Sequence, residues 1–125
     1  MQFDISELEQ WTDVIGRAPA VAMRQARAVV SKGSLNIKNE ARQNAPGDGH
    51  AKHYPASINY DITETPLEIM GEIGPAKGRR QWGLGNLIEY GSGHSPPRPH
   101  LEPALDHEAP KFLLAVQTIA GAGLE

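Results

Sequence analysis

Glycine and proline are distributed very unevenly along this chain of 125 residues. Residues 1–45 contain one proline and two glycines, whereas about half of all the glycine and proline residues lie between 71 and 103. Because both residue types disfavour the interior of a helix or a strand, long regular elements are restricted to the rest of the sequence. The pattern predicts a helical first third and a long glycine- and proline-rich loop or arm over 75–100.

The first third of the chain has the pattern of two helices, which together make a helical region over 6–45. Ser6, with a glutamate three residues later, forms a capping box and predicts a short helix over about 6–16 that ends before Pro19. A longer helix is predicted over about 20–44. The residues expected to be buried along it are spaced three or four apart: Met23, Ala26, Val30, Gly33 or Ser34, Ile37, Ala41 and Asn44.

The middle of the chain alternates between apolar and polar residues and predicts a β-hairpin over 57–74. Ile58, Tyr60 and Ile62 alternate with polar residues, so the first strand is expected to have one buried face. A turn at 64–66 is followed by a second alternating segment, which suits the antiparallel partner of the first strand.

The C-terminal part predicts a last helix over 101–120. Pro103 suits its first turn, whereas Pro110 lies in its interior and is expected to kink or split it. The short segment 87–91 fits either one helical turn or a third strand. Residues 1–125 therefore predict a single α+β domain, in which long N-terminal and C-terminal helices pack on a small antiparallel sheet.

Composition limits the class of protein. The formal net charge is −3 and the sequence pI is about 5.9, which argues against a protein whose main role is to coat nucleic acid. The chain has no cysteine, so disulfides, thiol catalysis and cysteine metal sites are excluded. We expect no membrane association, because no run approaches the roughly 18–20 apolar residues of a membrane span, and the N-terminus has no readable signal peptide.

Five histidines make a small metal-dependent enzyme an alternative to consider. His50 and His53 lie in a predicted loop, where their spacing does not direct both rings to one ion as it would on a helix. Solvent-exposed loop histidines are the simpler interpretation of all five. Ser92 stands between glycines but lacks the flanking pattern of a hydrolase nucleophile. We therefore expect no enzyme activity, no catalytic residue, no metal ligand and no cofactor.

The predicted loop contains a small basic cluster of Lys77, Arg79 and Arg80, followed by Trp82. Cations beside an aromatic ring are typical of phosphate or nucleic-acid contacts, so a weak nucleic-acid-binding domain is a second alternative. Three cations are few in a chain that is acidic as a whole. A loop that contacts a neighbouring subunit is therefore the favoured interpretation.

Four short motifs occur in an order that resembles one protein family. The motifs are Ala41-Arg42 with Ala45-Pro46, Ser57-Ile58, Glu89-Tyr90-Gly91-Ser92, and Pro99-His100-Leu101-Glu102-Pro103-Ala104-Leu105. Their order and spacing resemble the neck, or head–tail joining, proteins of long-tailed bacteriophages, a group that includes minor tail components and tail-completion proteins. His100 stands where that family usually has an aromatic residue, and the segments 47–55 and 74–86 depart from the family pattern.

The resemblance implies a structural virion protein without catalytic activity. Such proteins form oligomeric rings, here expected to be hexameric or dodecameric, that connect the capsid portal complex to the tail. The implied partners are other copies of the chain and neighbouring head-closure, tail-terminator or tail-tube proteins. Genomic DNA would pass through the ring without sequence-specific binding. The implied location is the neck or tail of the virion, after synthesis in the cytoplasm of the bacterial host.

Subunit or ring contacts are expected in the loop and at the start of the last helix. Gly91 is expected to adopt a positive φ, which would fix the direction of Glu89 and Tyr90. For these two residues, an intra-domain capping carboxylate and a core tyrosine are equally good interpretations. The full set of expected contact residues is Lys77, Arg79, Arg80, Trp82, Glu89, Tyr90, Gly91, Pro97, Arg98, Pro99, Leu101 and Pro103.

Overall fold

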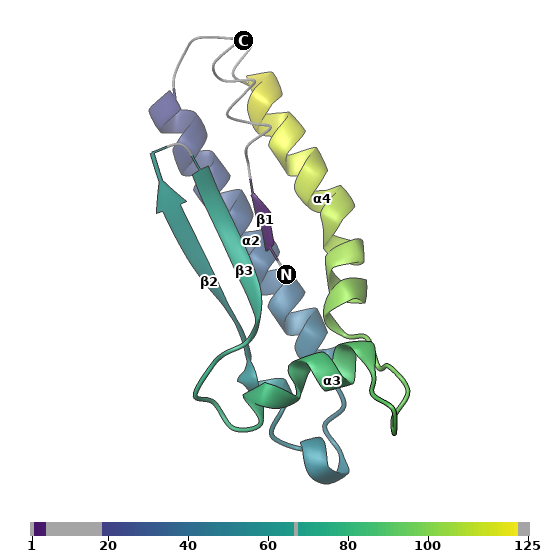
Figure 1. Cartoon of the computed structure of the whole chain (residues 1–125). Coiled ribbons are helices and arrows are strands. Elements are labelled where there is room, and N and C mark those ends of the chain that lie inside the picture. The colour runs from purple at the N-terminus through teal and green to yellow at the C-terminus, as the bar shows by residue number, and fades with distance from the viewer. Residues whose placement is uncertain (1, 5–18, 67, 123–125) are drawn as a thin grey trace.

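A computed structural model of the chain describes residues 2–4, 19–66 and 68–122 (Figure 1). The elements follow in the order β1 (Gln2–Asp4), α2 (Pro19–Asn44), β2 (Ile58–Thr65), β3 (Glu68–Pro75), α3 (Gly85–Tyr90) and α4 (Leu101–Ala122). The predicted α+β class is confirmed, with long helices flanking a small antiparallel sheet. The short helix predicted over 6–16 lies outside the described residues.

The hairpin predicted over 57–74 is formed by β2 and β3. The two strands are antiparallel, and their register runs from Ile58 opposite Pro75 to Thr65 opposite Glu68. The short strand β1 pairs with the other edge of β3, so the strand order is β1-β3-β2. Sequence reasoning missed β1 because three residues are too few to show an alternating pattern.

The long helix α2 buries the stripe that its sequence predicts. Ala26, Val30, Gly33, Ser34, Ile37 and Ala41 are all buried, and Met23 is half-buried. Only Asn44 departs from the prediction, because it is exposed at the last turn of the helix. Ala45 is buried instead and donates its N–H to the carbonyl of Ala41 at 2.9 Å.

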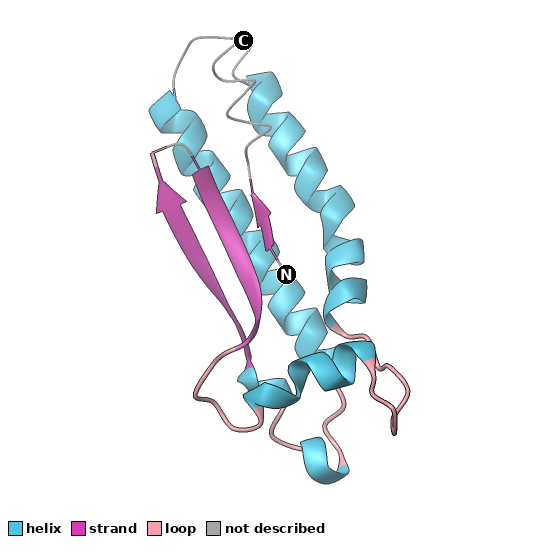
Figure 2. Ribbon diagram, in the orientation of Figure 1, coloured by secondary structure: helices cyan, strands magenta, loops and turns pink. Residues whose placement is uncertain are grey.

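The stripe on α2 packs on the inner face of β2 and β3 and on α4 (Figure 2). Two apolar clusters result, one toward the start of α2 and one toward its end. The first contains Ala26, Val30, Ile69, Val116 and Ile119. The second contains Ile37, Ala41, Ala45, Tyr54, Ile58, Ile73 and Ala104.

The helix α4 is continuous through Pro110, so of the two expected effects of this proline, a kink or a split, the split is wrong. Proline removes one backbone hydrogen bond, to the carbonyl four residues earlier. Pro110 and Asp106 are both exposed, so water can reach that carbonyl. Buried Ala104 and Val116 hold the helix against the core on either side. No helix in the described part of the chain is long and apolar enough to cross a membrane.

The segment 75–100, predicted as a loop or arm, contains helical structure. A 3-10 turn at Trp82–Leu84 leads directly into α3. Of the two alternatives for 87–91, the helical turn is right and the third strand is wrong. Gly91 ends the helix with a φ of +79°, as expected for a residue that reverses the chain direction.

Candidate functional site

Residues 76–100, here called the arm, are fastened to the body of the molecule by Glu89. This side chain lies on α3 and is only 6% exposed. Its Oε1 accepts hydrogen bonds from the backbone N–H groups of His100 at 3.0 Å and Leu101 at 2.9 Å. Its Oε2 accepts from the N–H of Glu102 at 3.2 Å. Glu89 therefore caps the N-terminus of α4 from a different helix.

The capping hydrogen bonds favour the charged form of Glu89. Burial alone would raise the pKa of this carboxyl group, but the N–H groups of Leu101, His100 and Glu102 outweigh it and hold the pKa below its ordinary value. The positive end of the α4 dipole, at the N-terminus of the helix, also stabilises the charged carboxylate. Of the two interpretations of Glu89, the structure shows the intra-domain capping carboxylate.

His100 is completely buried between Glu89 and Tyr54, so the expectation that all five histidines are exposed in loops is wrong for this one. Its Nδ1 lies 3.0 Å from Glu89 Oε1 and 3.2 Å from the carbonyl oxygen of Arg98. Its Nε2 lies 2.6 Å from the hydroxyl of Tyr54. Because Nδ1 faces two acceptors, it carries the proton, and Nε2 accepts from Tyr54. A flat ring with both nitrogens satisfied can thus occupy a core position.

Tyr54 completes this network. Burial, assisted by the nearby charge of Glu89, raises the pKa of Tyr54 to about 12, so its hydroxyl stays protonated and donates to His100. The rings of Tyr54 and His100 meet edge to face with centroids 5.2 Å apart. Although Tyr, His and Glu in series resemble a proton relay, both rings are fully buried and already paired. The network therefore links the arm to the body of the molecule.

A second fastening comes from Gln81, which no sequence pattern singled out. It is the one non-glycine residue with a positive φ, +62°, in the described part of the chain. Its Oε1 accepts from the N–H of His53 at 2.7 Å, and its Nε2 donates to the carbonyl of His50. The Arg79 guanidinium donates to the carbonyl of Ala56 at 3.3 Å. The basic loop is therefore pinned to the segment before β2.

The arm presents large apolar side chains to solvent. Trp82 is 40% exposed, Leu87 is 54% exposed and Tyr90 is 74% exposed. The interpretation of Tyr90 as a core residue is therefore wrong. Leu87 was not among the expected contact residues, because one short helical turn does not reveal which of its faces is covered.

The other expected contact residues lie along the same arm and in the first turn of α4. Lys77, Arg79 and Arg80 are exposed before α3, and Pro97, Arg98 and Pro99 are exposed between α3 and α4. Arg98 Nη1 is 3.8 Å from Asp48 Oδ1, a weak exposed ion pair. Leu101 and Pro103 are half-buried in the first turn of α4.

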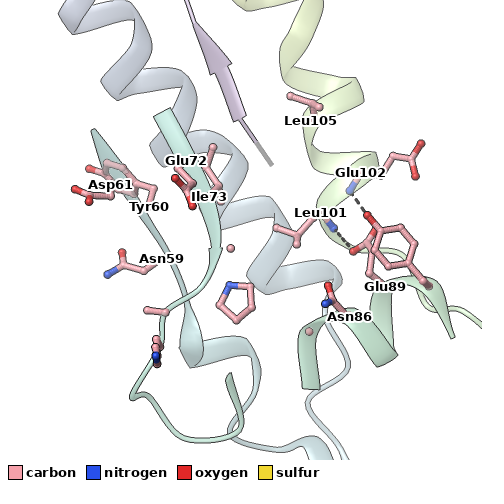
Figure 3. Close-up of a pocket in the computed structure, with 16 residues that line it drawn as sticks. Asn59, Tyr60, Asp61, Glu72, Ile73, Asn86, Glu89, Leu101, Glu102 and Leu105 are labelled. Atoms are coloured by element: carbon pink, nitrogen blue, oxygen red, sulfur yellow. Dashed lines mark hydrogen bonds between the residues drawn. The ribbon is translucent and has the colours of Figure 1, made fainter. Parts of the chain in front are cut away.

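A groove of about 1020 Å³ separates the hairpin from α3 and the start of α4 (Figure 3). Ile73, Leu101 and Leu105 contribute apolar surface to it. Carboxylates stand on both sides, with Asp61 and Glu72 on the strands and Glu102 on α4. Sequence reasoning did not find the groove, because its walls come from segments that are far apart in the chain.

Within residues 2–4, 19–66 and 68–122, no group of three or more histidine and carboxylate side chains is arranged to hold a metal ion. His50 is exposed and His53 is half-buried in the turns before β2. His107 lies 2.9 Å from Glu40 through Nδ1, as an exposed pair between α4 and α2.

Comparison of the chain with protein-family models, with curated proteins and with solved structures found no match in any of the three. The resemblance to head–tail joining proteins therefore rests on the four sequence motifs. In three dimensions the third and fourth motifs touch, since Glu89 of the third caps the helix that begins inside the fourth.

Proposed function

We propose that this chain is a structural subunit of a tailed-bacteriophage or prophage particle. It forms an oligomeric ring at the head–tail junction and acts by contact with neighbouring subunits and rings, without catalysis. The observation that carries this proposal is the arm, which is fastened from within by Glu89, His100 and Gln81 while its aromatic residues face solvent.

A preformed arm lowers the cost of binding. Ordering a flexible segment at an interface lowers affinity, and a segment that is already ordered avoids that cost. Tryptophan, tyrosine and arginine are the residues that contribute most to interfaces. The arm offers Trp82, Tyr90 and three exposed arginines on a preformed backbone, which suits repeated assembly contacts.

The four motifs support the same conclusion and specify the class of assembly. Their order along the chain resembles that of neck proteins, and the fold belongs to the α+β class that the sequence predicts. We infer a closed ring of six or twelve copies, placed between the portal complex and the tail tube, through which DNA passes.

The test compares two variants that remove similar exposed apolar surface from different places. Leu87→Ser with Tyr90→Ser alters the arm, whereas Leu113→Ser with Leu114→Ser alters α4, where these leucines are 47% and 65% exposed. Native mass spectrometry would measure oligomer size, and mixing with tailless heads and free tails would measure particle joining. We expect the arm variant to lose both and the α4 variant to retain both.

Thermal unfolding would show that both variants keep the fold, because all four side chains are exposed. A wild-type chain that stays monomeric at every concentration and does not join heads to tails would refute the proposed function. An arm variant that assembles as well as the wild type would show that Leu87 and Tyr90 are not part of the contact surface.

A further inference from the structure

The outer face of the hairpin is acidic. Residues 58–75 include four carboxylates and no lysine, arginine or histidine, and of the four Glu64 is paired with Arg27 of α2 at 2.6 Å. Asp61 and Glu72 are direct partners in the strand register, and both point away from the core.

Asp61 and Glu72 border the groove rather than an open surface. Glu102 stands on the opposite wall, at the start of α4 (Figure 3). Between the walls lie Ile73, which is buried, and Leu101 and Leu105, which are half-buried. In the described part of the chain, neither Asp61 nor Glu102 forms an ion pair. The groove therefore combines apolar surface with an acidic rim, and it suits a segment that has both cations and a large apolar side chain.

The chain itself contains such a segment. The loop from Lys77 to Trp82 has three cations followed by an exposed tryptophan, and residues 73–88 contain no acid. Lys77, Arg79 and Arg80 make no ion pair within the described residues. Charge complementarity between loop and groove is the observation that identifies the occupant.

The loop does not fill the groove of its own chain. Lys77 reaches the groove, but Arg79, Arg80 and Trp82 are not among the residues that line it. The hydrogen bonds of Gln81 to His50 and His53 hold this part of the loop on the segment before β2. The complementary segment must therefore come from another molecule.

We propose that the groove of one copy receives the loop Lys77–Trp82 of the next copy in a head-to-tail contact. This inference rests on the proposed function, and it names the two surfaces that meet. Because each chain carries both this groove and this loop, the contact is heterologous, and repetition with a closing rotation makes a ring. Arg79 and Arg80 would face Asp61 and Glu102, while Trp82 would cover Leu101 and Leu105.

Charge reversal on each side tests the contact. The groove variant is Asp61→Lys with Glu102→Lys, and the loop variant is Arg79→Glu with Arg80→Glu. A matched control, Glu68→Lys with Asp106→Lys, makes the same change in charge outside the residues that line the groove. Native mass spectrometry at low salt is expected to show oligomers for the wild type and the control, and only monomers for each of the other two.

The decisive sample is an equimolar mixture of the groove and loop variants. In the mixture the natural loop of the groove variant matches the natural groove of the loop variant, and the reversed loop matches the reversed groove, so mixed oligomers are expected although each variant alone is a monomer of 13.5 kDa. A chain that carries all four reversals should recover oligomers. Since the natural chain has no cysteine, Glu102→Cys mixed with Arg80→Cys should also give a disulfide-linked heterodimer.

The outcomes separate this inference from the proposed function. A wild type that forms rings, together with a groove variant that also forms them or a mixture that stays monomeric, overturns the loop-in-groove contact and leaves the ring proposal intact. A wild type that never oligomerises overturns both. Circular dichroism of each variant would identify loss of fold, in which case the two cysteine variants decide the question.

Discussion

At the scale of single residues, Glu89 has the largest influence on how the arm is held. It accepts three backbone hydrogen bonds from the first turn of α4 and lies 3.0 Å from the ring of His100. The sequence suggested both a capping role and a contact role for this carboxylate, and burial decided between them. Local pattern could not decide, because the donors are eleven to thirteen residues away.

Replacing Glu89 by glutamine should lower the free energy of unfolding by about 1–2 kcal/mol at neutral pH, since one acceptor oxygen and the charge are lost. The folded pKa of Glu89 is lowered from an ordinary value of 4.5, so its contribution is present above that value. It is lost as the pH falls through the folded pKa. Thermal unfolding should therefore show a difference in melting temperature between wild type and variant that is smaller at pH 3 than at pH 7.

Glu102→Gln is the control, because its side chain is exposed and only its N–H takes part in the cap. Equal melting temperatures for Glu89→Gln and wild type at pH 7 would contradict the capping role.

Tyr54→Phe tests the other end of the same network. The variant leaves Nε2 of His100 buried without its donor, which should cost about 1–3 kcal/mol at neutral pH. The folded pKa of Tyr54 is raised to about 12 from 10, so the wild type should lose stability between about pH 10 and pH 12, as the unfolded chain ionises first. Urea unfolding should show that the free energy of unfolding falls less between pH 8 and pH 11 for Tyr54→Phe than for the exposed control, Tyr90→Phe.

At the scale of elements, the link between α3 and α4 depends on one glycine. Gly91 has a φ of +79°, and an added Cβ would lie 2.7 Å from the backbone nitrogen of Pro97. Gly93 follows two residues later, with no atom within 4 Å of the corresponding Cβ position. The positive φ of Gly91 was predicted from sequence, but the close approach of Pro97 was not.

Gly91→Ala should destabilise the fold by roughly 2 kcal/mol or more, because it combines an unfavourable φ with a steric clash. Gly93→Ala, the matched control, should change stability by less than about 0.5 kcal/mol. Differential scanning calorimetry of both variants measures the difference. Equal effects of the two substitutions would mean that the α3–α4 link is not constrained at Gly91.

At the scale of the whole molecule, charge is separated into distinct regions. The outer hairpin face and the groove are acidic, and the loop before α3 is basic, although the chain as a whole has a net charge of only −3. Composition could not reveal this separation, because the net charge does not say where the charged residues lie in the fold. The fold produces it by placing Glu102 opposite Asp61 and Glu72.

Self-association should therefore weaken as salt is added, since the screening length falls from about 10 Å at 0.1 M to about 3 Å at 1 M. Analytical ultracentrifugation across this range should show a shift toward monomer, with little change in the melting temperature of the monomer itself. Association that strengthens with salt would point to the apolar residues Leu87 and Tyr90 as the main contact, and against the charged loop and groove.

The amino-acid sequence by itself determined the elements that depend on local spacing. The buried stripe of α2, the hairpin and the start of α4 follow from periodicity, turn residues and caps, because each is specified by neighbours within a few positions. Tertiary structure alone decided the burial of His100, the left-handed conformation of Gln81 and the groove between hairpin and arm. These features join segments up to 46 residues apart, as Tyr54 and His100 are, and no local pattern encodes which distant segments will meet.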